Sequence, residues 1–202
     1  MYDQWVQNME EGKTVAVLMI DQSAAFDVCN HTILEAKLEL EEEQNSTAQW
    51  FHSYLSDRSQ CSKVEGKVSS VLNIPACSVI QGGCRSGLLY TILTCDLPDI
   101  IHQHIIKEPA RYCVEDGDMA TFVDDSTNYY GNKDPKIVRE VTQKNFNSIE
   151  DYMTSNKHKS YGDKSHLLVL TKGEGQGGGV AAARRREAVT LQAGGNNLAL
   201  TE

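Results

Sequence analysis

The sequence has no long apolar run and no leader-like start. No stretch approaches the roughly 18 apolar residues of a membrane span. Met1-Tyr2-Asp3-Gln4 lacks the basic segment followed by an apolar one that opens a secretory signal. We therefore expect an intracellular protein, of the cytoplasm or the nucleus, with no membrane partner. With 202 residues, 40% of them apolar, the chain has room for one domain, or for a domain and a tail.

Paired cysteines and an excess of positive charge are also missing. The six cysteines, at positions 29, 61, 77, 84, 95 and 113, include no Cys-x-x-Cys pair and no histidine at zinc spacing. They are expected to be reduced thiols, mostly small core residues. Lys and Arg number 19 against 28 Asp and Glu, a net charge of −9. Because affinity for phosphates comes from Lys and Arg, this balance argues against a broad nucleic-acid surface.

Two adjacent carboxylates, Asp124 and Asp125, lie inside a strand-like run from Met119 to Tyr130. Adjacent aspartates at the tip of a hairpin repel each other unless a bound cation neutralises them. A solvated turn is the simpler explanation, because Asp is common in turns. A third carboxylate on another strand would favour a metal site instead.

Asp21 provides a third carboxylate. It ends the β-branched, nearly all-apolar run 14–20, which is typical of a strand buried on both faces. A carboxylate in that place is costly unless it is paired, hydrogen-bonded or metal-bound. From the residues alone, a helix N-cap at Asp21 explains it equally well, with a helix beginning directly after it.

The remaining pattern predicts an α+β fold. Amphipathic helices are expected at 32–43, from Ser46 to near 58, and at 135–153 after an Asp134 cap; a hairpin is expected at 60–71 and a short strand at 167–170. This order indicates an antiparallel sheet with helices packed on one face. A polar connection is expected at 156–163.

Two glycine-rich segments are expected to be loops. The segment 81–87 precedes an apolar stretch at 88–97 and lacks Gly-Lys-Ser/Thr, so it is not a P-loop. It is either an ordinary strand-to-helix turn or a place where the backbone approaches a ligand. After Thr171 the glycine-rich run 173–179 and the arginines 184–186 follow. Too little apolar area is available there to offset the ordering entropy, so we expect 172–202 to be flexible.

Five blocks of sequence occur in a recognisable order and spacing between Val15 and Leu170. They read Asp21-Gln22-Ser23-Ala24-Ala25-Phe26-Asp27-Val28-Cys29-Asn30-His31; Trp50 to Arg58; Gln81-Gly82 with Leu88-Leu89-Tyr90 and Asp96-Leu97-Pro98; Phe122-Val123-Asp124-Asp125; and Asp163-Lys164-Ser165. Together they resemble the reverse transcriptase of non-LTR retrotransposons. The first block is similar to that family's Asp-x-x-x-Ala-Phe-Asp-x-x-x-His, and the fourth to its Tyr/Phe-Ala-Asp-Asp.

This resemblance implies a polymerase palm with part of the fingers over residues 1–171, and no thumb. Residues 172–202 would form a Gly-rich and Arg-rich segment, truncated before the primer grip. The implied reaction is template-directed addition of deoxynucleotides to a primer 3′ end by two-metal nucleotidyl transfer, as in an RNA-directed DNA polymerase. The implied partners are an RNA or DNA template, a DNA primer and dNTPs. An isolated fragment is expected to be weak or inactive.

The resemblance also assigns a metal site. Asp21, Asp124 and Asp125 would be the catalytic carboxylates, and with the Ile20 carbonyl they would hold Mg²⁺, or Mn²⁺ in its place. Hard divalent ions prefer such oxygen ligands. Two of them can activate the 3′-hydroxyl and stabilise the leaving pyrophosphate.

Nucleotide contacts are implied as well. The Phe26 ring, beside Ala25, would exclude a 2′-hydroxyl, and Gln81 with Gly82 would lie against the incoming nucleotide and template. Lys164 would donate a proton to the pyrophosphate, unless it is a plain surface lysine.

Three positions depart from the family's pattern. Ile80 replaces a Pro, Ser86-Gly87 stands where Gly or Ser is followed by Pro, and Val123 is bulkier than the usual Ala. Two alternatives therefore stay open. One is a catalytically inactive retroelement remnant that acts as a binding module or has no function; the other is a different two-metal phosphoryl-transfer enzyme.

Overall fold

The computed structural model describes residues 1–22, 24–41, 46–106, 117–158 and 165–172, with the short pieces 192–193, 196–197 and 199–200. The chain divides into two compact units, and each is described by itself. The first unit is Met1–Ser23, Asp96–Met153 and Ser160–Glu202, and the second is Ala24–Cys95 and Thr154–Lys159. Within the described ranges, no helix has the length and apolar character needed to cross a membrane.

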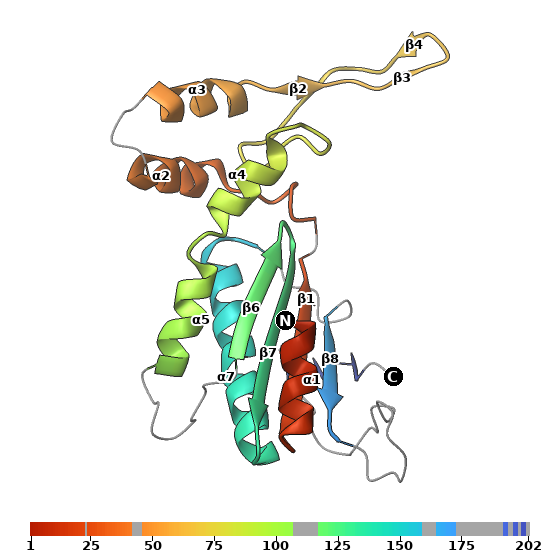
Figure 1. Ribbon diagram of the computed structural model, residues 1–202. Coiled ribbons are helices and arrows are strands. Elements are labelled where there is room, and N and C mark those ends of the chain that lie inside the picture. The colour runs from red at the N-terminus through yellow and green to blue at the C-terminus, as the bar shows by residue number, and fades with distance from the viewer. Residues whose placement is uncertain are drawn as a thin grey trace. The chain divides into compact units, whose positions relative to one another are not determined.

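A five-stranded sheet, in the order β11-β8-β1-β7-β6, forms the centre of the first unit (Figure 1). Its strands are β1 (Thr14–Asp21), β6 (Gly117–Phe122), β7 (Asp125–Asn132), β8 (His166–Leu170) and β11 (Ala199–Leu200). Neighbouring strands are antiparallel except β11, which runs parallel to β8. The predicted strand at 14–20 is therefore confirmed as the central one, and the run 119–130 forms the β6–β7 hairpin.

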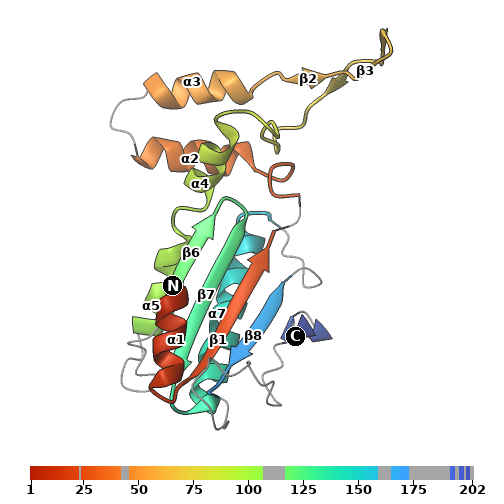
Figure 2. The ribbon, with the colours of Figure 1, turned by 45° about the vertical axis from the view of Figure 1, so that its right-hand side comes forward.

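Helices cover both faces of this sheet (Figures 1 and 2). On one face Leu18 and Ile20 pack against α5 (Leu97–Ile106) and α7 (Pro135–Ser155). On the other face Val15 and Val17 pack against α1 (Tyr2–Glu10). The prediction of helices on one face was wrong, because a central strand without polar alternation has two apolar faces and needs a cover on each.

The predicted start of the long helix is confirmed. The Asp134 side chain accepts a hydrogen bond from the backbone N–H of Lys136 at 2.9 Å. Pro135 occupies the first helical position, where its missing N–H and fixed φ cost nothing. The cap orients a helix whose buried side faces the sheet.

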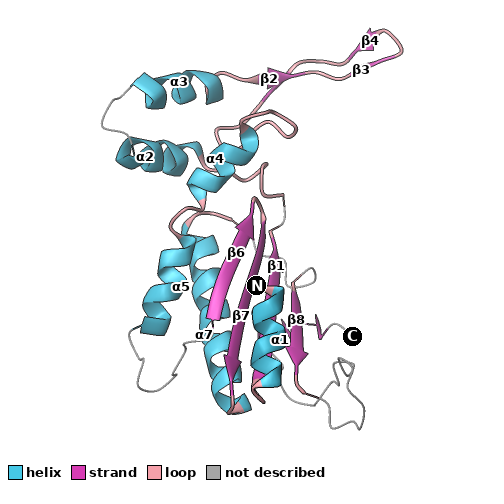
Figure 3. Cartoon of the chain, viewed as in Figure 1, coloured by secondary structure: helices cyan, strands magenta, loops and turns pink. Residues whose placement is uncertain are grey.

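The second unit contains three helices and a hairpin arm in its described part (Figure 3). The helices are α2 (His31–Glu41), α3 (Ser46–Leu55) and α4 (Ser86–Leu93). The arm, residues 59–73, pairs β2 (Ser59–Gln60) with β5 (Leu72–Asn73), and β3 (Lys63–Val64) with β4 (Lys67–Val68). The predicted hairpin is confirmed, with Glu65 and Gly66 as its two-residue turn.

The cysteines agree only partly with the prediction. The described cysteines form no disulfide, and Cys113 lies outside the described residues. Cys29 is buried and donates to the Ala25 carbonyl at 3.1 Å. Burial, with the nearby Asp27 charge, raises its thiol pKa to about 12. Core placement was wrong for the other four, because Cys61, Cys84 and Cys95 are exposed and Cys77 is only half-buried.

Candidate functional site

The β1 strand and the β6–β7 hairpin bring three aspartates to one edge of the sheet. Strand register makes Asp21 the direct partner of Asp125, and such antiparallel Cα partners lie about 4.5 to 5.5 Å apart. Asp124 lies in the two-residue turn, because Phe122 and Asp125 form the last pair of the hairpin. The end of β1 and this turn lie at the same end of the sheet in Figure 2.

The two paired carboxylates belong to the face of the sheet that α1 covers farther along. Residues directly opposite each other project to the same face, and Asp21 alternates in step with Val15 and Val17. Asp21 and Asp124 are half-buried, and Asp125 is exposed. Ile20 points to the opposite face and is buried in the core, so its side chain does not reach the face that carries the carboxylates.

These aspartates share an edge but do not form a closed cluster. In the ranges that the structure describes, no group of three His, Cys, Asp or Glu side chains is arranged to hold a metal ion. Their oxygen donors are of the kind that Mg²⁺ prefers. Carboxylates gathered at one edge repel one another, and a cation is what would draw them together.

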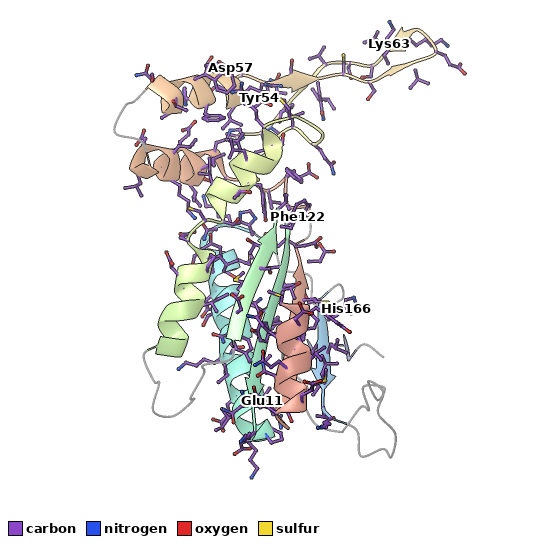
Figure 4. The ribbon with its side chains drawn as sticks, in the orientation of Figure 1. Glu11, Tyr54, Asp57, Lys63, Phe122 and His166 are labelled. Atoms are coloured by element: carbon purple, nitrogen blue, oxygen red, sulfur yellow. The ribbon has the colours of Figure 1, made fainter. Side chains whose placement is uncertain are left out.

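The turn that carries Asp124 is strained and exposed. Val123 has a φ of 56°, which is a true outlier for a β-branched residue and costs on the order of 1 to 3 kcal/mol. Phe122 precedes it and is 80% exposed, at the end of the hairpin in Figure 4. An aromatic ring is thus presented to solvent next to the carboxylates.

Asp21 does not cap a helix. Residues 24–27 form a turn in which the Ala24 carbonyl accepts from the N–H groups of Asp27 and Val28 at 2.8 and 3.1 Å. The next helix begins at His31, and its cap is Asn30, whose side chain accepts from the Ile33 N–H at 3.1 Å. The N-cap alternative for Asp21 was therefore wrong.

The predicted nucleotide contacts lie in the second unit. Ala25 is buried, and the half-buried Phe26 ring lies 5.6 Å from the ring of Tyr90 between centroids. Tyr90 in turn contacts His158 edge to face, with centroids 5.8 Å apart. Phe26 is thus backed by two further rings.

His158 was missed because its sequence context is polar. The segment 156–163 was predicted only as a polar connection, and its described residues Asn156 and His158 are both buried. Burial, with a smaller effect of the Lys37 charge, lowers the pKa of His158 to about 4. The ring is therefore neutral at pH 7 and packs as an aromatic group.

Hydrogen bonds join the Phe26 segment to the segment before Gln81. The Val79 N–H donates to the Phe26 carbonyl at 2.7 Å. His31 donates from Nε2 to the Ser78 carbonyl at 2.7 Å and from its backbone N–H to Ala76 at 3.3 Å. We call these three hydrogen bonds the seam.

The glycine loop begins with an exposed turn. Gln81 and Gly82 are both exposed, and Gly82 has a φ of 81°, which favours glycine. The Ser86 hydroxyl donates to the Ile80 carbonyl and closes the loop where α4 begins. Lys164, the predicted proton donor, lies outside the described residues.

Comparison with known proteins finds structural but not sequence relatives. No known family and no curated protein matches the chain. Apo telomerase from Candida tropicalis, truncated from its C-terminal domain, matches with a TM-score of 0.61 and 12% identity, over 86% of this chain and 34% of that one. Telomerase from Candida albicans, in complex with a fragment of telomeric RNA, matches with a TM-score of 0.59 and 17% identity, over 81% and 29%. The Candida tropicalis enzyme in complex with such an RNA fragment matches with a TM-score of 0.50 and 13% identity, over 83% of this chain and 28% of that one.

At these identities the likeness concerns the fold alone. The chain has a fold like that of part of these telomerases, with a palm-like antiparallel sheet and helices. It spans about a third of the length of these telomerases.

Proposed function

We propose that this chain is the palm-centred part of a non-LTR retrotransposon reverse transcriptase. Its reaction is the template-directed addition of deoxynucleotides to a primer 3′ end. One observation carries the proposal: the register that pairs Asp21 with Asp125 beside the Asp124 turn. The telomerase-like fold supports a polymerase, and the five sequence blocks support the retrotransposon type.

In this proposal Asp21 and Asp124 hold Mg²⁺, or Mn²⁺, with Asp125 and the Ile20 carbonyl adjacent. The bound ions supply Lewis acidity to the attacking hydroxyl and to the leaving group. The donor chemistry fits these ions, and the shared edge supports the assignment.

The second unit contributes the nucleotide contacts of this proposal. The Phe26 ring, backed by Tyr90 and His158, excludes a 2′-hydroxyl. The exposed Gln81 and Gly82 backbone accommodates the base pair, and Lys164 is the proposed proton donor. Partners are an RNA or DNA template, a DNA primer and dNTPs; the RNA in complex with the Candida albicans telomerase supports a nucleic-acid partner.

Primer extension tests the reaction directly. The wild-type chain, Asp124→Asn and Asp21→Asn are compared with Mg²⁺ and with Mn²⁺ on a primed RNA template. Losing a metal ligand is expected to lower incorporation about 1,000-fold, since each 1.4 kcal/mol of barrier is about tenfold. Asp118→Asn is the matched control, because it removes the same charge from an exposed position of β6. Equal background incorporation by wild type and Asp124→Asn contradicts polymerase activity.

Ion binding gives a test that needs no catalysis. At an ion concentration tenfold above its Kd, binding to the folded state stabilises by about 1.4 kcal/mol. The melting temperature of the wild type should therefore rise with Mn²⁺, and that of Asp21→Asn should not. A chain that neither binds ions nor extends primers fits the inactive remnant.

A further inference from the structure

Two aromatic rings of α3 and two arginines form a stacked ladder in the second unit. Trp50 and Tyr54 are stacked, with centroids 5.4 Å apart and planes 11° from parallel. The Arg85 guanidinium carbon lies 4.3 Å from the Trp50 centroid, and that of Arg58 lies 5.0 Å from the Tyr54 centroid. A guanidinium is attracted to the negative face of such a ring. We call these four side chains the arginine ladder.

The two arginines differ in burial and in hydrogen bonding. Arg58 is half-buried and donates from Nη1 to the Tyr54 carbonyl at 2.8 Å, so it also secures the end of α3. Arg85 is exposed, and within the described residues its guanidinium makes no hydrogen bond or ion pair. A guanidinium that packs on an aromatic ring can still donate from its N–H groups to two oxygens of an anion. Arg85 is therefore held in place with its donors unused.

Arg85 belongs to the glycine loop, and the loop lies against the ladder. A Cβ on Gly83 would meet the Tyr54 hydroxyl at 3.3 Å and the Ser86 hydroxyl at 2.7 Å, so the loop backbone approaches α3 closely. Gln81 and Gly82 are exposed in the same loop. The proposed template contact and the Arg85 guanidinium are thus four residues apart in one short segment.

The charge of this part of the chain is opposite to that of the whole. Between Ser46 and Cys95 the charged residues are Arg58, Lys63, Lys67 and Arg85 against Asp57 and Glu65, a net of +2 from 4 − 2. The complete chain has a net charge of −9. Lys63 extends the positive charge onto the arm, where Figure 4 labels it. This segment therefore departs from the acidity of the chain as a whole.

We propose that Arg85, held on Trp50 by the ladder, binds the phosphate backbone of a single-stranded nucleic-acid template. This deepens the proposed function and rests on it. A planar, preorganised guanidinium matches a phosphate better than a mobile cation does. The Trp50 ring already packs against both the Arg85 guanidinium and the Tyr54 ring, and what Arg85 offers a strand is a cation for its phosphates. The contact is therefore to the backbone and independent of sequence.

Strand binding is measured without metal or primer, so catalysis is not required. The probe is a fluorescent oligo(U) RNA of about 20 nucleotides, titrated with the complete chain at several salt concentrations. Arg85→Ala is expected to weaken binding about five- to tenfold and to reduce the salt slope by about 0.7, the value for one single-strand phosphate contact. Trp50→Leu, which leaves Arg85 without its platform, should weaken binding by a smaller factor. Arg139→Ala is the matched control, since it removes one exposed arginine from α7.

Circular dichroism of each variant establishes that it is folded. Equal affinity of folded Arg85→Ala and Arg139→Ala overturns the proposal, and so does a wild type that binds no strand. A loss that is the same for oligo(U) and for a free nucleoside triphosphate also overturns it, since the site then reads a triphosphate rather than a strand. A chain that binds through Arg85 but extends no primer supports this inference and contradicts the polymerase proposal.

Discussion

The carboxylate edge and the arginine ladder place their charges by different means. At the edge, backbone register determines the positions of the carboxylates, because the pairing of β1 with β7 puts Asp21 opposite Asp125. In the ladder, side chains from distant positions, Trp50 and Arg85, hold each other by stacking. A backbone-defined site depends on a packed core beneath it, whereas a stacked one depends on a few exposed contacts.

The largest expected effect comes from the core between the sheet and the helices α5 and α7. Leu18 is fully buried between β1 and the helices, so Leu18→Ala should destabilise the first unit by about 3 kcal/mol. Val68, exposed on the arm, is the control, and its change to Ala should stay within about 0.5 kcal/mol. Denaturant midpoints measure both. Similar losses of unfolding free energy for the two variants would contradict the assignment of Leu18 to a packed core and of Val68 to an exposed arm.

An intermediate effect concerns the pH dependence of the second unit. The folded-state pKa of His158, about 4, lies below its ordinary value of 6.5, so the unfolded chain binds the extra proton first. Stability is complete above about pH 6.5 and falls as the pH drops toward 4, by about 2 kcal/mol after allowance for solvent near the ring.

His158→Phe keeps an aromatic ring beside Tyr90 and removes the titration. Its unfolding free energy should therefore lose about 2 kcal/mol less than the wild type between pH 7 and pH 4. Parallel pH curves for the two proteins would show that His158 is solvated in the folded state.

The smallest effect is a gain in stability at the carboxylate edge. Glycine tolerates the φ of 56° that strains Val123, so Val123→Gly should stabilise the hairpin by about 1 kcal/mol, measured as a higher melting temperature. Thr121→Gly, in the regular part of β6, should instead destabilise by a similar amount, about 1 kcal/mol. A lower melting temperature for Val123→Gly would mean that the Val123 side chain stabilises the hairpin by more than its backbone strain costs.

The elements that carry the aspartates were predictable from local sequence patterns. The apolar run 14–20, the hairpin around Asp124-Asp125 and the Asp134-Pro135 start are all local signals, and each element formed where expected. The pairing of Asp21 with Asp125 then follows from two neighbouring strands.

Features that depend on distant residues were not predictable in this way. The mostly polar start of the chain gave no cue that α1 covers the second sheet face, and a polar context concealed the burial of His158. No local pattern pairs Trp50 with Arg85, because a stack across 35 residues exists only in the folded chain. Whether the aspartates bind metal stays a prediction, since their side chains share an edge without closing a cluster.

The seam between Phe26 and the glycine loop has a consequence for selectivity. Because the Val79 and His31 bonds tie the two segments together, a displacement of one carries the other with it. Under the proposed function, the residue that inspects the sugar and the loop that accommodates the template base would shift as one body. A variant that breaks the seam would then change both the tolerance toward ribonucleotides and the fidelity of base pairing. A variant that improves only one of these properties would have to keep the hydrogen bonds of the seam.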